Sequence, residues 1–282
     1  MDFDMKIPRE KICLYSAFNP ERSSSREIIE GAARHGVGGV ELMSFCEELC
    51  TADLNVAREL GRLARGYGLK LPCFSVGIDL MENGDEKMEL LRRFADICSD
   101  LEIPYLHHTI ALDFTSGEIT DEIREERFKR GSDYALSLME YARPLGVRTV
   151  IEDQGFVFNG IDNCLRLCEL SDNGIGIIAD VGNIMFWGEK PEDFIRAMRG
   201  RVVHAHLKDN IKADAPEDSG SWYPTRLGTY LKETSIGDGD IDYAAVDSAF
   251  RDIGYDGMYA LEFPSTTDEE ELKKMLSRLS AN

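Results

Sequence analysis

The 282-residue sequence has no excess of positive charge. Its 32 lysine and arginine residues face 52 aspartate and glutamate residues, which leaves a formal net charge of −20. A surface with this balance repels phosphate backbones, so the sequence argues against nucleic-acid binding driven by overall electrostatics. The chain also has no run of about 18 apolar residues, the length that a membrane helix needs. We therefore expect neither a nucleic-acid partner nor a membrane partner.

Targeting signals and disulfide patterns are missing as well. The stretch MDFDMKIPREKICLY has neither the charged-then-apolar pattern of a signal peptide nor the Arg-rich pattern of a transit peptide. The seven cysteines are an odd number, and the spacing of four in Cys46/Cys50 and Cys164/Cys168 suits neighbouring helix turns better than a metal knuckle. We expect reduced thiols and a cytoplasmic location.

Proline is scarce, with nine residues, and no proline- or serine-rich linker divides the chain. A hydrophobic share of 43% is typical of a folded protein and excludes a disordered one. We therefore expect one domain that spans residues 1–282.

Apolar segments alternate regularly with amphipathic segments along the whole chain. The expected strands are residues 12–18, 39–45, 69–76, 105–110, 148–152, 176–180, 201–207 and 258–263. The expected helices are residues 25–35 with Ser25 as the candidate cap, 53–67, 85–99, 120–143, 163–170, 191–198, 243–253 and 268–279, the helix at 243 following a long connection. Eight such units predict a single (β/α)8 TIM barrel with parallel strands, in preference to an open doubly wound sheet.

The C-terminal ends of the strands are where such a barrel carries its function. Four consecutive strands end in residues of metal-binding type, namely Glu152, Asp180, His206 and Glu262. Because side chains alternate along a strand, the residues two positions earlier lie one layer below them on the same face: Val150, Ile178, His204 and Ala260. Three of these four are suited to fill a barrel. We expect the four polar residues to form one inward-facing ring.

Three carboxylates in one ring repel one another and raise the pKa of at least one of them unless a cation is present. One nitrogen and three oxygen ligands suit Mn²⁺, Mg²⁺ or Co²⁺, with Zn²⁺ as a further candidate. The sequence therefore predicts one divalent metal ion, bound by Glu152, Asp180, His206 and Glu262.

Five strings of the sequence carry a resemblance to a known family: VIED, IADVGN, HAHLKD, SIGDGDID and LEF. Together they resemble the xylose-isomerase-like barrels, and within them the sugar isomerases and epimerases that include ketose 3-epimerases. The resemblance is close over residues 148–265, and in the first half it rests on GVEL at residues 39–42. It implies one divalent metal on the ligand set above, with Glu152 and Glu262 as the catalytic acid–base pair. The implied activity is proton abstraction next to the carbonyl of a small sugar or polyol, through a metal-stabilised enediolate.

Three positions depart from the ketose 3-epimerase pattern. Asn183 stands three residues after the Asp ligand, where those enzymes carry His. Lys212 stands six residues after the His ligand in place of Arg, and Phe158 stands six residues after the first Glu ligand in place of Glu. The resemblance thus supports metal binding more strongly than it supports a particular substrate.

Residues near the expected barrel mouth are candidate substrate contacts: His108, Asn183, Lys208, Glu41, Trp187 and Trp222. Alternation turns only one of His107 and His108 inward, and we favour His108. Lys208 either binds a substrate oxygen or neutralises carboxylates, and Glu41 either binds a hydroxyl or completes a buried network. The two tryptophans either pack on a sugar ring or anchor loops. His204 is expected to be a satisfied core histidine.

Other functions remain open at this stage. A dehydratase acting on inosose or dehydroshikimate resembles the same ring, and its reaction also starts with proton abstraction. An endonuclease-IV-like nuclease shares the barrel but uses an Asp-x-His sequence that this chain lacks, and the net charge argues against it. A sugar-binding protein without catalysis and a homo-oligomeric assembly are further alternatives. The acidic run GDGD at residues 237–240 lacks the lysine of a phosphate loop.

Overall fold

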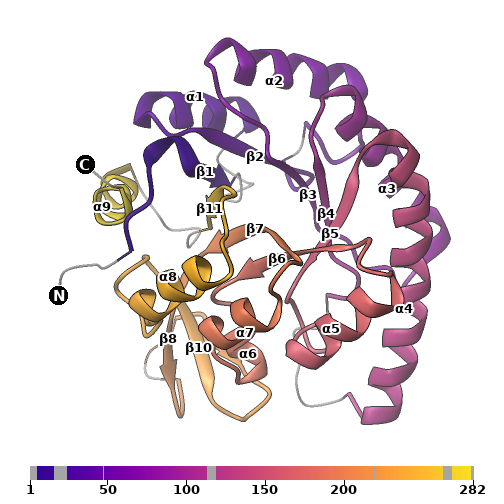
Figure 1. Cartoon of the computed structure of the whole chain (residues 1–282), viewed down its shortest axis with the longest axis vertical. Helices are drawn as coiled ribbons and strands as arrows, with labels where there is room; N and C mark the ends of the chain where they lie inside the picture. The colour runs from indigo at the N-terminus through magenta and orange to yellow at the C-terminus, as the bar shows by residue number, and fades with distance from the viewer. Residues whose placement is uncertain are drawn as a thin grey trace.

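The computed structural model describes residues 5–15, 24–46, 48–112, 119–216, 218, 220–262 and 269–280. Eight parallel strands close into a barrel in the order β1-β11-β7-β6-β5-β4-β3-β2, with helices around them (Figure 1). The strands are β1 (Ile12–Tyr15), β2 (Gly39–Met43), β3 (Cys73–Val76), β4 (Tyr105–His108), β5 (Arg148–Glu152), β6 (Gly176–Asp180), β7 (Val202–Leu207) and β11 (Tyr259–Leu261). The predicted (β/α)8 barrel is confirmed. Of the predicted strand and helix residues, 16–18, 263 and 268 lie outside the described part of the chain.

The outer helices begin and end close to their predicted bounds. They are α1 (Ser25–His35), α2 (Leu54–Gly66), α3 (Gly84–Asp100), α4 (Asp121–Ala142), α5 (Ile161–Leu170), α7 (Pro191–Ala197), α8 (Tyr243–Asp252) and α9 (Glu269–Leu279). Three short helical turns add to them: η1 (Arg9–Lys11), η2 (Arg143–Leu145) and α6 (Ile184–Trp187). The described helices include none with both the length and the apolar composition that a bilayer crossing requires.

Helix starts follow the capping chemistry of the sequence, with one correction. Asp53 caps α2 by accepting hydrogen bonds from the backbone N–H groups of Asn55 and Val56. The cap of α1 is Ser24, and the predicted cap Ser25 is instead the first helical residue and is buried. Ser24 and Glu27 form a reciprocal capping box, which satisfies two backbone donors. The N-cap therefore lies one residue earlier than predicted.

The barrel interior is built in layers, as the alternation of strand residues requires. Val150 and Ile178 are fully buried and form, with Cys73, a separate small apolar cluster inside the barrel. Burying a side chain of this size stabilises a fold by roughly 1.5–3 kcal/mol. This apolar layer supports the polar residues that follow two positions later on the same strands.

The connection before α8 is the main departure from the predicted organisation. The sequence predicts a long connection here without assigning strands to it. The structure shows within it an antiparallel sheet of β8 (Asp209–Ala213), β10 (Tyr230–Thr234) and β9 (Tyr223–Pro224), here called the side sheet. Figure 1 shows it beside the barrel, below β7 and α8. Its strands are short and polar, so hydrophobic periodicity does not reveal them.

The GDGD run closes around a side chain of this connection. The carboxylate of Asp209 accepts hydrogen bonds from the backbone N–H groups of Gly237 (2.9 Å), Gly239 (3.1 Å) and Ile241 (3.3 Å). It also accepts from its neighbour Asn210 at 2.9 Å. A carboxylate of the chain itself thus occupies the cradle of backbone donors, which agrees with the prediction that this run is no phosphate loop.

Candidate metal centre and active site

Four strand ends meet at one point of the barrel mouth. Glu152 ends β5, Asp180 ends β6, His206 is the next-to-last residue of β7, and Glu262 directly follows β11. These strands are neighbours in the barrel, and the register pairs His206 with Asp180 on one side and with Ala260 on the other. The backbone N–H of Glu262 donates to the carbonyl of Leu207 at 2.9 Å, which extends the pairing by one residue.

The ligand-type atoms of these four residues, called the ring below, converge around His206. Its Nδ1 lies 3.2 Å from Oε2 of Glu152, 3.6 Å from Oε2 of Glu262 and 3.9 Å from Oδ2 of Asp180. One atom from each residue can be chosen so that all lie within 4.8 Å of one another. Ligands at about 2.1 Å from a common ion have this mutual spacing.

The surroundings of Asp180 are a second observation that fits a divalent cation at this point. Asp180 is 1% exposed, and its Oδ1 accepts hydrogen bonds from the backbone N–H groups of Gly182 and Asn183, both at 2.8 Å. Its Oδ2 accepts no hydrogen bond and has the ammonium of Lys208 at 3.1 Å. A buried carboxylate oxygen without a donor costs free energy unless a cation satisfies it. The loop after β6 therefore holds Asp180 in place through Oδ1, and Oδ2 is left to face a cation, which is Lys208 in this structure and could be a metal ion.

Without a metal, the pKa values of the carboxylates in the ring are shifted strongly from their usual values. Burial raises the pKa of Asp180 to about 7, since the effect of Lys208 does not offset burial and the nearby Glu262 and Glu152. Burial also opposes ionisation of Glu262, but Lys208 and His206 outweigh it and lower the pKa of Glu262 to about 2. The carboxylates are thus unequal, and two cationic side chains decide which of them stays charged.

Lys208 lies inside the ring rather than beside it. Its Nζ is 3.0 Å from Oε1 of Glu262 and 3.1 Å from Oδ2 of Asp180, and it donates to Oδ1 of Asn183 at 3.1 Å. The amide Nδ2 of Asn183 is buried and has no partner. Lys208 and Asn183 therefore both lie at the ring, where Lys208 pairs with two carboxylates, the second of the two roles considered for it.

Glu41 lies one layer below and belongs to a buried network. Its carboxylate is fully buried and accepts hydrogen bonds from Ser75 and from Nε2 of His204, the latter at 2.7 Å. Both of its oxygens are 3.3 Å from Nε2 of His206. Of the two roles predicted for Glu41, the structure therefore favours the network. His204 is satisfied by Glu41, as expected of a core histidine.

Of the two histidines on β4, His107 and not the favoured His108 points to the ring. His107 points to the ring: its Nε2 is 3.8 Å from Oε1 of Glu152, and its ring meets that of His206 edge-on at 5.8 Å between centroids. Nδ1 of His107 contacts Ser75 at 2.8 Å. His108 instead lines a small cavity whose wall also includes Glu152 and Phe158, and its Nδ1 lies 3.1 Å from the backbone carbonyl oxygen of Thr109. Alternation along the strand predicts that one of the two histidines points inward, but it does not say which one.

The tryptophans lie away from the ring. The guanidinium carbon of Arg226 lies 4.5 Å from the ring centroid of Trp187, and that of Arg124 lies 5.9 Å from the same centroid. Trp222 donates from Nε1 to Asp218 at 2.8 Å within the side-sheet connection. Both contacts are those of residues that anchor a loop.

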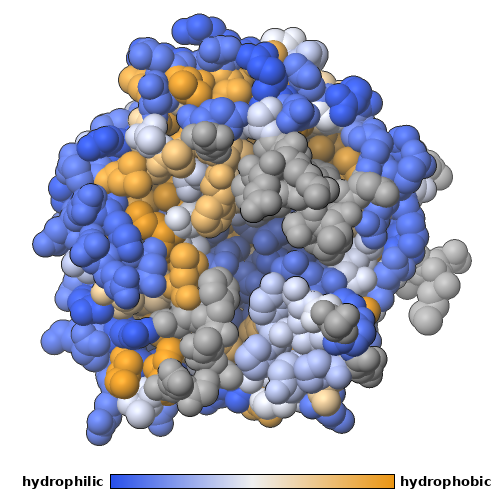
Figure 2. Space-filling view, turned by 180° about the vertical axis from the view of Figure 1, so that it is seen from behind, coloured by the Kyte–Doolittle hydropathy of each residue, from blue (hydrophilic) through white to orange (hydrophobic). Residues whose placement is uncertain are grey.

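A cavity of about 440 Å³ opens beside the ring. It is lined by Gln154, Gly155, Phe156, Asn183, Phe186, Lys208, Tyr223, Glu233 and Glu262. Its aromatic residues are therefore Phe156, Phe186 and Tyr223 rather than the two tryptophans. Figure 2 shows a hollow with a hydrophilic floor on the face opposite to the view of Figure 1. Sequence reasoning missed Glu233 because the side sheet that carries it was not predicted.

The three departures from the ketose 3-epimerase pattern have definite places. Asn183 reaches the ring. Phe158 is 4% exposed and stacks on Phe128, with 5.1 Å between ring centroids, so it lies in the packed shell. Lys212 is exposed on β8.

Residues 29–281 match the family model described as xylose isomerase-like TIM barrel, and the chain belongs to this family. An inosose dehydratase from Clostridium perfringens is 28% identical over 146 residues, which are 50% of this chain and 48% of that protein. The chain thus spans about half the length of this curated relative.

Solved structures share the whole architecture at low identity. The D-psicose 3-epimerase of Clostridium cellulolyticum H10 superposes with a TM-score of 0.75 at 15% identity, over 96% of this chain and 100% of that chain. The probable 3-DHS dehydratase AsbF of Bacillus anthracis superposes with a TM-score of 0.74 at 18% identity, over 95% and 97%. These similarities show the fold.

Proposed function

We propose that this protein is a divalent-metal-dependent isomerase or epimerase that removes a proton next to the carbonyl of a small sugar or polyol. The proposal rests chiefly on the positions of Glu152 and Glu262. They stand at the two ends of the arc β5-β6-β7-β11, yet both reach Nδ1 of His206, at 3.2 and 3.6 Å. Carboxylates that approach one point from two sides can remove a proton on one face of a substrate and return it on the other.

The residues that would hold the ion are Glu152, Asp180, His206 and Glu262, with Mn²⁺, Mg²⁺ or Co²⁺ favoured and Zn²⁺ as an alternative. When bound, such an ion polarises the substrate carbonyl and stabilises the charge that develops as the proton leaves. Nζ of Lys208 and Nδ2 of Asn183 would donate to substrate oxygens and orient the carbon acid. Both line the cavity beside the ring.

The second candidate function is a dehydratase, and the position of Lys208 favours it. Elimination of water needs a base for the carbon-bound proton and an acid for the departing hydroxyl. Lys208 lies 3.0 Å from Glu262, so the two could supply acid and base on adjacent atoms of one substrate. The similarity to inosose dehydratase over half of the chain supports this alternative.

One experiment separates the two functions. The metal-loaded protein is incubated in D₂O with D-psicose, scyllo-inosose or 3-dehydroshikimate, and the products are analysed by mass spectrometry. The product of an isomerase or epimerase carries deuterium at carbon and has otherwise the same composition as the substrate. A dehydratase product has lost the mass of one water. If neither change occurs with any of these compounds or a wider ketose panel, the proposal of proton abstraction is wrong.

A further inference from the structure

The carboxylate of Glu233 faces the ring from outside the barrel. Leu231 and Glu233 are two positions apart on β10, so their side chains leave the same face of the side sheet. Leu231 is fully buried, whereas Glu233 is exposed and lines the cavity together with Lys208 and Glu262. The other face of β10 carries Lys232, which pairs with Asp218. The side sheet thus directs a carboxylate into the cavity.

Within the described residues this carboxylate makes no hydrogen bond and no ion pair at contact distance, although it lies within the electrostatic reach of Lys208. Lys208 is already held between Asp180 and Glu262. It is also the one lysine or arginine among the described lining residues. A phosphate or carboxylate group of a substrate would therefore meet two carboxylates and a committed ammonium, whereas hydroxyl groups would find an acceptor.

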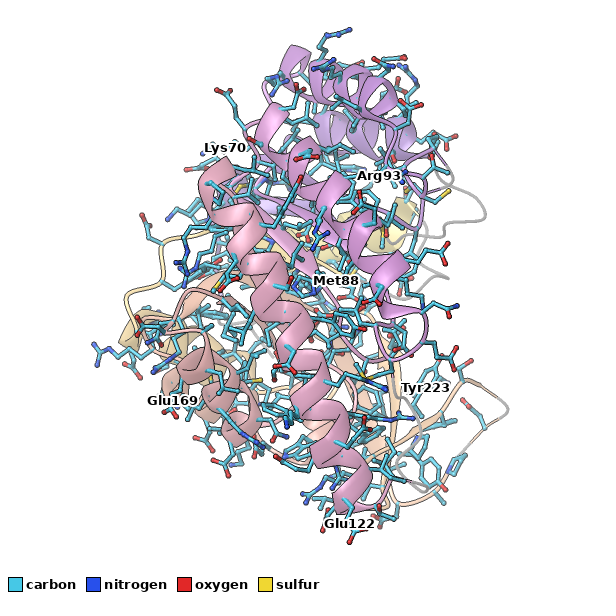
Figure 3. The ribbon with its side chains drawn as sticks, turned by 90° about the vertical axis from the view of Figure 1, so that its right-hand side faces the viewer. Lys70, Met88, Arg93, Glu122, Glu169 and Tyr223 are labelled. Atoms are coloured by element: carbon cyan, nitrogen blue, oxygen red, sulfur yellow. The ribbon has the colours of Figure 1, made fainter. Side chains whose placement is uncertain are left out.

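The remaining walls suit the carbon skeleton of such a substrate. Phe156, Phe186 and Tyr223 present aromatic surface to the cavity, and Tyr223 is 45% exposed. Figure 3 shows Tyr223 on the side of the molecule opposite to Glu169 of α5. Aromatic faces pack on the apolar C–H face of a sugar or cyclitol, and a carboxylate beside them accepts from its hydroxyls.

We propose that Glu233 is a specificity-determining residue that binds hydroxyl groups at the end of the substrate remote from the ring and rejects an anionic group there. This assignment rests on the proposed function, because it takes the cavity as the substrate site. It predicts a substrate that is uncharged at its remote end, and it gives the side sheet a role in recognition.

The test compares a neutral sugar with its phosphate. Binding of D-fructose and D-fructose 6-phosphate to the Mg²⁺-loaded protein is measured by calorimetry for the wild type, Glu233→Gln and Glu233→Lys. Glu169→Lys is the control with the same charge change, because Glu169 is exposed on α5 and does not line the cavity. Thermal unfolding verifies that each variant folds.

The wild type should bind the neutral sugar at least tenfold more tightly than the phosphate. Loss of a charged hydrogen-bond acceptor should weaken fructose binding to Glu233→Gln by about tenfold or more. Glu233→Lys should reverse the preference, and Glu169→Lys should keep it. The assignment is overturned if the preference is unchanged in Glu233→Lys, if the wild type prefers the phosphate, or if neither sugar binds the wild type.

Failure here is distinct from failure of the proposed function. Deuterium exchange into a substrate whose binding ignores the charge at position 233 would leave proton abstraction standing and remove the role of Glu233. A preference that depends on the charge at position 233, without deuterium exchange into any compound, would keep the role of Glu233 and remove proton abstraction.

Discussion

Both carboxylate oxygens of Glu41 lie 3.3 Å from Nε2 of His206, while Nδ1 of the same imidazole faces the three carboxylates of the ring. Burial lowers the pKa of His206, but Glu41, Glu152 and Glu262 together outweigh burial and raise that pKa well above its usual value. Glu41 comes from β2 and therefore reaches His206 across the barrel interior. If a metal ion replaces the proton on Nδ1, this contact would hold the remaining proton of the imidazole on Nε2.

Glu41→Gln should therefore weaken divalent metal binding by about 10–100-fold, the usual effect of losing the carboxylate behind a metal-binding histidine. Calorimetric titration with Zn²⁺ and Mn²⁺ measures the affinity. Glu169→Gln, on the exposed face of α5, serves as the control. Unchanged affinity in folded Glu41→Gln protein would contradict the tautomer-fixing role.

Metal binding should be stoichiometric and should depend on pH through Asp180. One ion per chain is expected, and because the pKa of Asp180 is raised to about 7, its proton must leave when the ion binds. Affinity should fall as the pH drops below 7, because Asp180 then keeps its proton and the ion must displace it. Elemental analysis and titrations between pH 5.5 and 8.5, about 1.5 units on each side of that pKa, check both points. Asp180→Ala should lose the ion, and affinity that is flat over this range would disprove the role of Asp180.

Asn183→Ala should leave the metal stoichiometry unchanged while it lowers activity. The side chain of Asn183 accepts a hydrogen bond from Lys208 and lines the cavity, and its neutral amide is a poor substitute for a ligand imidazole. Metal content and turnover are measured on the same preparation. Loss of the ion in this variant would mean that Asn183 is a ligand.

Glu152→Gln and Glu262→Gln should each lose about 10²–10⁴ in turnover, the contribution of a general acid or base. Since both residues are also candidate ligands, the rates must be measured at metal concentrations that refill the site, with occupancy measured directly. In an epimerase, exchange of the carbon-bound proton with D₂O should survive from one epimer in one variant and from the other epimer in the second variant. Near-wild-type turnover in both metal-filled variants would leave these glutamates as ligands alone.

Asp209→Ala should destabilise the protein by about 2–4 kcal/mol, because it removes the shared acceptor of four backbone N–H groups, of which those of Asn210 and Ile241 are buried. The free energy of unfolding is measured by urea denaturation. Asp214→Ala removes an exposed carboxylate from the same connection and should change the stability by less than about 0.5 kcal/mol. Equal stability of both variants would show that the GDGD loop does not depend on Asp209.

The sequence by itself determined the barrel and the ring. Eight apolar segments alternate with amphipathic ones, and a chain with this order buries its apolar faces by closing a parallel sheet under helices. Once that was established, the alternation of side chains placed Glu152, Asp180 and His206 at corresponding strand ends. Periodicity and the alternation of side chains along a strand are local properties, and for that reason they could be predicted without coordinates.

Tertiary structure alone decided the phase and the partners of the remaining residues. Whether His107 or His108 points inward depends on the register of β4 against its neighbours, because a shift of one residue exchanges the two faces. The contact between Glu41 and His206 joins residues far apart in the chain, and Glu233 reaches the cavity only because the side sheet folds back beside the mouth. Such contacts arise from packing between distant segments, and no local pattern in the sequence encodes them.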